Sequence, residues 1–155
     1  RNNGDLTFSD LTWRSRASGY GVGSGVGTAD LDDDGFLDIF FTNRTFYTGG
    51  EQITKSDRNY LLFNRGNRNN WLTVNLVGQE SNTNAYGARV SLSSGDLTQY
   101  REATSAHGYN SGNDPRMHFG LGNKSSIDFI EVLWPSGKKS KLLNPSINQT
   151  VTIKE

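Results

Sequence analysis

The chain has 155 residues, of which 33% are hydrophobic, and this length allows one ordinary domain with a small appendage. Its 16 basic and 16 acidic side chains cancel, which argues against nucleic acid or an anionic membrane as the main partner. There is no cysteine, so disulfides and thiolate metal sites are excluded, and no apolar run approaches the roughly 18–20 residues of a membrane span.

The first third of the chain alternates short apolar segments with turns rich in Gly, Asn and Asp, which predicts short strands. Residues 6–8 indicate the end of a strand. Glycine then occupies every second position from Gly19 to Gly27, a pattern that favours close packing of backbones over a phosphate-binding loop, since no helix follows. Residues 37–42 and 59–64 predict further strands, and the polar residues 43–58 between them predict a surface excursion.

The most informative segment is the acidic run of residues 30–38, which connects two predicted strands. Carboxylates at loop positions 1, 3 and 5, glycine at position 6, a backbone carbonyl at position 7 and a carboxylate at position 9 supply hard oxygen ligands, and Ca²⁺ is the cation that fits them best. The predicted ligands are Asp30, Asp32, Asp34, the carbonyl of Phe36, and Asp38. The alternative is a solvated acidic turn.

This loop differs from an EF-hand in two respects. Position 12 is Phe41 instead of a bidentate Glu, and the flanking segments are predicted strands instead of helices. The prediction is therefore a β-hairpin closed by a calcium loop. The polar residues 64–70 that follow the hairpin unit are the best candidate for a boundary.

Beyond residue 70 the alternation of apolar and polar residues becomes regular. Residues 72–76, 88–92, 130–134 and 151–153 each place apolar side chains on one face of a strand, which predicts an all-β sandwich. One long aperiodic gap lies between Tyr100 and Phe119. Loops of this length within a compact domain are usually functional.

These motifs resemble two known families. Residues 25–43 resemble one FG-GAP/VCBS repeat, a propeller-blade unit with a calcium hairpin. The second half (WLTVNLVG at 71–78, SN at 81–82, YGARV at 86–90, HFGLG at 118–122 and WPSG at 134–137) resembles the ASPIC/UnbV domain over residues 71–155. The resemblance implies an all-β chain with a single propeller-blade-like calcium hairpin unit at 1–66, a transthyretin-like β-sandwich at 71–155, and a sandwich loop at 106–117 that plugs the propeller.

A single blade leaves its apolar faces uncovered, because repeat units bury those faces by stacking on neighbours. Three explanations remain open. The chain is the C-terminal piece of a longer protein, which its start at Arg1 also favours, or the blade packs on its own sandwich, or it packs on another protomer.

Catalytic chemistry has little support in the sequence, so we predict a non-enzymatic protein. The two histidines have no metal-ligand spacing, no Gly-x-Ser-x-Gly elbow occurs, and most clustered aspartates are explained by the metal. The side chains of Trp13, Trp71 and Trp134 are expected in the core or at strand ends, with a sugar-stacking platform as the alternative. Asn82 and Asn84 are candidates for a second ion site.

The leading hypothesis is a secreted, calcium-stabilised β module for adhesion, protein interaction or assembly. An extracellular or periplasmic setting is expected because loops of modest affinity stay filled only where calcium is plentiful. The alternatives are a self-assembling subunit of an extracellular filament, motivated by the blade's open edge, and a carbohydrate-binding or carbohydrate-cleaving protein. The expected partners are accordingly another protein, neighbouring protomers or a glycan.

Overall fold

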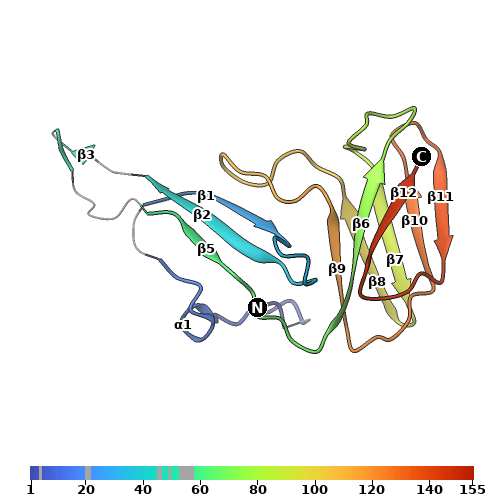
Figure 1. Cartoon of the computed structure of the whole chain (residues 1–155), viewed down its shortest axis with the longest axis horizontal. Coiled ribbons are helices and arrows are strands. Elements are labelled where there is room, and N and C mark those ends of the chain that lie inside the picture. Colours follow the sequence, from blue (N-terminus) through green and yellow to red (C-terminus); the bar gives the residue numbers. More distant parts are fainter. Residues whose placement is uncertain (4, 20–21, 45–46, 49, 53–57) are drawn as a thin grey trace.

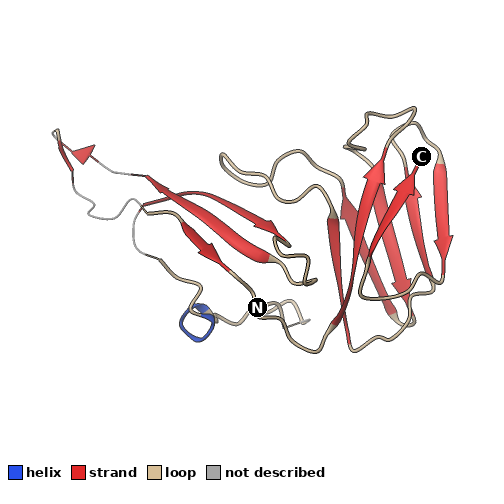
Figure 2. Cartoon of the chain, in the orientation of Figure 1, coloured by secondary structure: helices blue, strands red, loops and turns tan. Residues whose placement is uncertain are grey.

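A computed structural model describes residues 1–3, 5–19, 22–44, 47–48, 50–52 and 58–155. It confirms the prediction of an all-β chain, since the only helix among these residues is the four-residue α1 (Thr12–Ser15). No helix in the described segments has the length and hydropathy needed to cross a bilayer. Figures 1 and 2 show a small sheet next to a two-layered sandwich.

The small sheet has the strand order β1-β2-β5, with β1 (Val22–Ala29), β2 (Asp38–Arg44) and β5 (Tyr60–Leu62). All its pairings are antiparallel, and Ala29 lies opposite Asp38 where the first two strands meet the acidic loop. The predicted hairpin around this loop is therefore confirmed. A separate pair, β3 (Tyr47–Thr48) and β4 (Glu51–Gln52), lies within the predicted excursion, and residues 45–46, 49 and 53–57 of that stretch lie outside the described residues.

The sandwich consists of two sheets with the orders β11-β10-β7-β8 and β12-β6-β9 (Figure 1). Its strands are β6 (Asn70–Val77), β7 (Arg89–Ser94), β8 (Leu97–Glu102), β9 (Met117–Gly122), β10 (Phe129–Leu133), β11 (Lys139–Leu143) and β12 (Thr150–Lys154). The last strand runs parallel to β6, and the other pairings are antiparallel.

The core lies between these two sheets and follows the period-2 pattern of the sequence. Leu72 and Val74 of β6 and Val90 and Leu92 of β7 belong to one hydrophobic cluster, and all four are completely or almost completely buried. Burial of each such side chain away from water contributes about 1.5–3 kcal/mol to the stability of the fold. Trp134 is also buried, and its indole Nε1 donates a hydrogen bond to Ser140 Oγ at 2.8 Å.

The small sheet has no comparable core of its own. Every hydrophobic side chain that is buried among the described residues belongs to the sandwich half, between residues 72 and 153. By contrast, Phe40 and Leu61 of the small sheet, and Phe63 directly after β5, are between 44% and 57% exposed. The small sheet must therefore depend on its contacts with the sandwich and on the acidic loop.

Candidate metal centre

The acidic loop connects β1 to β2, and its backbone turns through two left-handed residues. Asp33 has φ 57° and Gly35 has φ +90°. Asp tolerates the left-handed region better than most residues, and Gly adopts it without steric cost. These two turns direct the carboxylates of the flanking residues toward one another.

Three of the predicted ligands converge. Asp30, Asp32 and Asp34 each offer a carboxylate oxygen, and these oxygens all lie within 4.8 Å of one another. Asp30 is buried at the end of β1, whereas Asp32 and Asp34 are exposed. A cation at their centre would therefore be held from below by a buried carboxylate and would remain open to solvent above.

Asp30 carries the clearest sign that a positive group belongs here. Its Oδ2 accepts a hydrogen bond from the backbone N–H of Gly35 at 2.9 Å, whereas its Oδ1 is buried and has no hydrogen-bond partner. Burial raises the pKa of Asp30, and the charges of Asp34 and Asp33 raise it further against the opposing effect of the Gly35 hydrogen bond. A buried oxygen without a donor is costly, and a hard cation such as Ca²⁺ matches this oxygen-only donor set.

Asp38, predicted as the ligand at position 9, lies outside the cluster of three carboxylates. It is only 1% exposed, and both of its carboxylate oxygens accept backbone hydrogen bonds, Oδ2 from Leu31 at 3.1 Å and Oδ1 from Asn64 at 2.8 Å. As the first residue of β2, it ties the start of the loop to the chain that leaves β5. Its role as a metal ligand stays a prediction.

Phe36 has two observed roles in the loop. Its backbone N–H donates to Asp34 Oδ1 at 2.9 Å and so orients one carboxylate of the cluster. Its ring packs where a side chain at Gly66 would stand, since a Cβ there would come within 2.8 Å of the ring. Its carbonyl stays a predicted ligand.

Sequence reasoning did not identify Arg116, which clamps the loop from the sandwich side. Its guanidinium donates to Asp33 Oδ1 at 2.9 Å and to the carbonyl oxygen of Asp30 at 3.1 Å, and it also binds both carboxylate oxygens of Asp114. The hydrogen bonds that its guanidinium donates to the carboxylates of Asp114 and Asp33 raise the pKa of Arg116. Arg116 is more than 80 positions from Asp33 and Asp30, so only the fold brings it to the metal loop.

The long loop that precedes Arg116 lies along the outer edge of β1 (Figure 1). The N–H of Asp114 donates to the carbonyl of Thr28 at 2.9 Å, and the N–H of Thr28 donates to Asn113 Oδ1 at 2.9 Å. A Cβ at Gly27 would come within 2.8 Å of the carbonyl oxygen of Gly112. This contact supports the interpretation that the alternating glycines give room for a close backbone neighbour.

A second contact joins the metal loop to the first sandwich strand. The indole of Trp71 lies against the backbone of Gly35, where a Cβ would overlap the ring. On β9, His118 stacks on the same indole with ring centroids 6.1 Å apart. The acidic loop is therefore held between Trp71 and Arg116, both from the sandwich half.

The structure bears on two further suggestions from the sequence. A shared tryptophan platform is wrong, because Trp134 is buried in the core, Trp71 covers Gly35, and Trp13 is exposed on α1. The expectation that Trp13 lies in the core or at a strand end is wrong as well, since its side chain is 86% exposed. Asn82 closes a turn, since its Oδ1 accepts from the N–H of Tyr86 at 2.8 Å and its Nδ2 donates to the Tyr86 carbonyl at 2.9 Å. The side chain of Asn82 therefore has a structural role in this turn, and a second ion site at Asn82 and Asn84 stays a prediction.

Comparison with known proteins places the sandwich half in a family. Residues 78–155, half of the chain, match the family described as ASPIC and UnbV. Over 146 residues the chain is 31% identical to cartilage acidic protein 1 of Homo sapiens, and 30% identical to the proteins of that name from Mus musculus and Xenopus tropicalis. Each match covers 89% of this chain and 20% of the relative, so the chain spans about a fifth of the length of these curated relatives. The chain belongs to the ASPIC and UnbV family.

Proposed function

We propose that this chain is a calcium-stabilised, non-enzymatic β module of an extracellular protein, in which the metal loop joins an FG-GAP/VCBS-like blade to the sandwich. The observation that carries this proposal is the convergence of carboxylate oxygens of Asp30, Asp32 and Asp34, together with a buried oxygen of Asp30 that has no donor. The similarity to cartilage acidic protein 1 supports the extracellular setting. The module then serves protein interaction, with its geometry dependent on calcium.

The chemistry of the bound ion would be structural. Ca²⁺ would supply positive charge among five aspartates in nine residues and would satisfy the free oxygen of Asp30. The chain's own groups would position the ligands and neutralise the charge that the ion does not contact. The N–H groups of Gly35 and Phe36 orient the carboxylates of Asp30 and Asp34. Arg116 forms an ion pair with Asp33, which lies outside the cluster, and so neutralises its charge.

Isothermal titration with calcium tests this proposal directly. We expect the EGTA-treated and desalted protein to bind one Ca²⁺, and Asp32→Asn to lose at least about tenfold in affinity because one ligand charge is removed. Asp33→Asn is the matched control. It removes the same charge from the same loop but leaves the cluster intact, so it should change affinity much less. Equal losses in the two variants would show that calcium is attracted only by the net charge of the loop.

Self-assembly is a second candidate, and a specific observation favours it. Phe40 and Leu61 lie opposite each other in the small sheet and are 44% and 45% exposed, which leaves an apolar patch on one face. Sedimentation velocity over a range of concentrations tests it, with Phe40→Ser expected to abolish association. A protein that stays monomeric at high concentration contradicts this candidate.

A further inference from the structure

A series of contacts leads from the sandwich to Asp30, the buried carboxylate of the metal loop. The imidazole of His118 on β9 stacks on the indole of Trp71, with ring centroids 6.1 Å apart and ring planes 21° apart. The indole packs against Gly35, where a Cβ would come within 1.9 Å of indole Cε2. The N–H of Gly35 in turn donates to Asp30 Oδ2 at 2.9 Å. A displacement of the imidazole can therefore reach the carboxylate through two intervening residues.

The backbone of Trp71 is fixed independently of its side chain. Its N–H donates to Asn148 Oδ1 at 3.0 Å, and its carbonyl accepts the N–H of Asn148 at 2.7 Å. The half-buried indole is the part that can still change its orientation. Because His118 stacks on this indole, the position of the imidazole limits how far the indole can turn away from Gly35.

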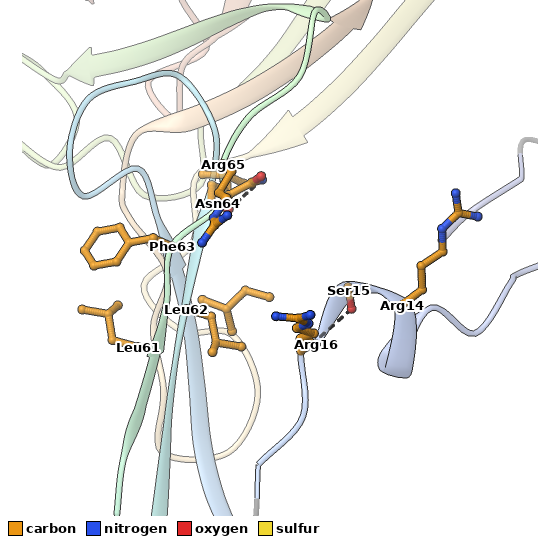
Figure 3. A pocket seen from close by; sticks show the side chains of 11 residues that line it. Arg14, Ser15, Arg16, Leu61, Leu62, Phe63, Asn64 and Arg65 are labelled. Atoms are coloured by element: carbon orange, nitrogen blue, oxygen red, sulfur yellow. Dashed lines mark hydrogen bonds between the residues drawn. The ribbon is translucent and has the colours of Figure 1, made fainter.

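A cleft of about 840 Å³ lies beside β5, and it does not supply this support (Figure 3). Residues 14–17 and 61–65 line most of it, and no aspartate of the metal loop is among its lining residues. The backbone of the loop is instead contacted by Trp71 at Gly35 and by Arg116, which donates to the carbonyl of Asp30 at 3.1 Å.

The surroundings of His118 favour a neutral imidazole. Burial lowers the pKa of His118, and the positive charge of Arg101 on β8 lowers it further. The guanidinium of Arg101 lies 5.1 Å from the ring centroid of Phe119, the next residue of β9. It is held there by hydrogen bonds to the carbonyl of Tyr100 at 2.8 Å and to Gln99 Oε1 at 3.1 Å.

The other groups near His118 supply no negative charge. From β6 the imidazole meets Trp71 and Thr73, which do not titrate at mildly acidic pH, and Nδ1 lies 3.5 Å from Thr73 Oγ1. Arg116, two positions earlier in the chain, is a second cation, already paired with carboxylates. Among the described residues, no carboxylate forms a hydrogen bond or an ion pair with the imidazole.

We propose that His118 is a positioning residue for the metal loop, and that its protonation weakens calcium binding. A protonated imidazole regains hydration by moving outward, away from Arg101, and the indole of Trp71 then loses the ring that supports it. Gly35 is held less firmly as a result, and with it the carboxylate of Asp30. The inference rests on the proposed calcium function and adds to it a dependence on mildly acidic pH.

One effect opposes this direction, because an imidazolium stacked on an indole is attracted by the ring. Burial and Arg101 act against that attraction, and the pKa of His118 is lowered from its ordinary value of 6.5. A lowered pKa means that the folded state prefers the neutral form. The stabilisation is therefore complete above about pH 6.5 and is lost as pH falls below this value.

Calorimetric titration with calcium at about pH 7.5, where the imidazole is neutral, tests the positioning role. We expect His118→Ala to weaken binding by about three- to tenfold, less than the roughly 10–100-fold typical of groups that bind a metal ligand directly, because two residues intervene. His118→Phe keeps a planar ring on the indole and should retain the affinity within about twofold. His107→Ala is the matched control, because it removes the other histidine, which is exposed in the long loop.

The same titration at about pH 5.5 tests the role of the proton. Carboxylate ligands also take up protons as pH falls, so the wild type is compared with His118→Phe, which keeps these ligands but cannot be protonated at position 118. We expect the wild type to lose at least about threefold more affinity than this variant between the two pH values. His107→Phe should follow the wild type. If His118→Ala does not fold by circular dichroism, this comparison still decides the proposal.

Hydrogen exchange in the calcium-free protein adds a measurement that needs no metal. The amide of Gly35 should exchange faster in His118→Ala than in the wild type, because its bond to Asp30 is held less firmly. A wild type that binds calcium, with a pH dependence equal to that of His118→Phe, would overturn the inference and leave the metal proposal standing. A wild type that binds no calcium would overturn both, even if exchange at Gly35 becomes faster.

Discussion

Gly35 occupies the position where the metal loop meets the sandwich. Its φ of +90° already disfavours other residues, and a Cβ would overlap the indole of Trp71. We expect Gly35→Ala to lower the free energy of unfolding by about 2–5 kcal/mol, from about 1–2 for the left-handed backbone and about 1–3 for the forced displacement of the ring.

The matched control for this substitution is Gly137→Ala. Gly137 has φ +89°, but a Cβ at this position would have no neighbouring atom within 4 Å, so only the backbone cost of about 1–2 kcal/mol should appear. Urea denaturation measures both variants. An equal loss of unfolding free energy in the two variants would mean that the indole of Trp71 does not pack tightly against the loop.

Glu155 is the residue from which we predict a dependence on pH. Its Oε2 accepts backbone N–H groups from Gln79, Glu80 and Ser81 at 2.7–2.9 Å, and its Oε1 accepts the hydroxyls of Ser81 and Ser136. Burial alone would raise the pKa of Glu155, but these hydrogen bonds outweigh it and lower the pKa from 4.5 to about 2. The last strand is thereby fastened to the turn that follows β6.

A lowered pKa in the folded state stabilises the protein above the unfolded-state value, and the stabilisation is lost as pH falls through the folded-state value. We therefore expect Glu155→Gln to lower the thermal midpoint at neutral pH, with the gap to the wild type narrowing between pH 4.5 and about 2. Glu102→Gln removes an exposed partner of Arg89, so its thermal midpoint at neutral pH should differ much less from that of the wild type. A gap that does not vary with pH would contradict this role.

Arg116 joins the two halves of the chain through its ion pair with Asp33 and its hydrogen bond to the carbonyl of Asp30, and Asp114 holds the guanidinium in place. We expect Arg116→Gln to lower the free energy of unfolding by about 1.5–3 kcal/mol, the range for hydrogen bonds to charged groups, because its pairing with Asp114 is largely shielded from solvent. The pair of Arg89 and Glu102 is well exposed, so Arg89→Gln should cost at most about 1 kcal/mol. Chemical denaturation compares the two, and equal costs would show that Arg116 is only a surface charge.

At the scale of elements, the edge of β1 is covered by a loop instead of a strand. Gly27→Val raises the strand propensity of β1 but places a side chain against the carbonyl of Gly112. We expect faster hydrogen exchange at the amide of Asp114, because its bond to Thr28 is broken. Gly23→Val, at a position with open space around it, is the control and should leave that amide protected.

The strands of the sandwich were predictable because one face of each is buried, and burial on one face imposes a period of 2 on residues such as Leu72, Val74, Val90 and Leu92. The hairpin and its left-handed Gly35 were predictable for a local reason as well, since the loop spacing itself requires them. Strands such as β11, whose exposed lysines alternate with half-buried residues, carry a weaker signal and were not predicted.

The rest of the site depends on contacts between residues distant in sequence. The spacing of the loop places Asp38 at a ligand position but does not show that two backbone N–H groups, one of them from Asn64, bind its oxygens. Similarly, Arg116 lies in an aperiodic loop, and no local pattern connects it to Asp33. The carboxylate cluster was therefore predictable, whereas the groups that surround it were not.

At the scale of the whole molecule, the stability of the chain is unevenly distributed. The sandwich contains every described hydrophobic residue that is buried, whereas the small sheet relies on the metal loop, on Trp71 and on the loop along β1. A bound ion that strengthens this loop should therefore stabilise the small sheet more than the sandwich.

Thermal unfolding with calcium and with EGTA tests the central claim most directly. At a calcium concentration about 100 times the dissociation constant, binding to the folded state adds about 2.7 kcal/mol, which raises the midpoint by about 5–10 °C for a chain of this size. We predict this shift in the wild type and its loss in Asp32→Asn. A wild-type midpoint that is the same in calcium and in EGTA would contradict the claim.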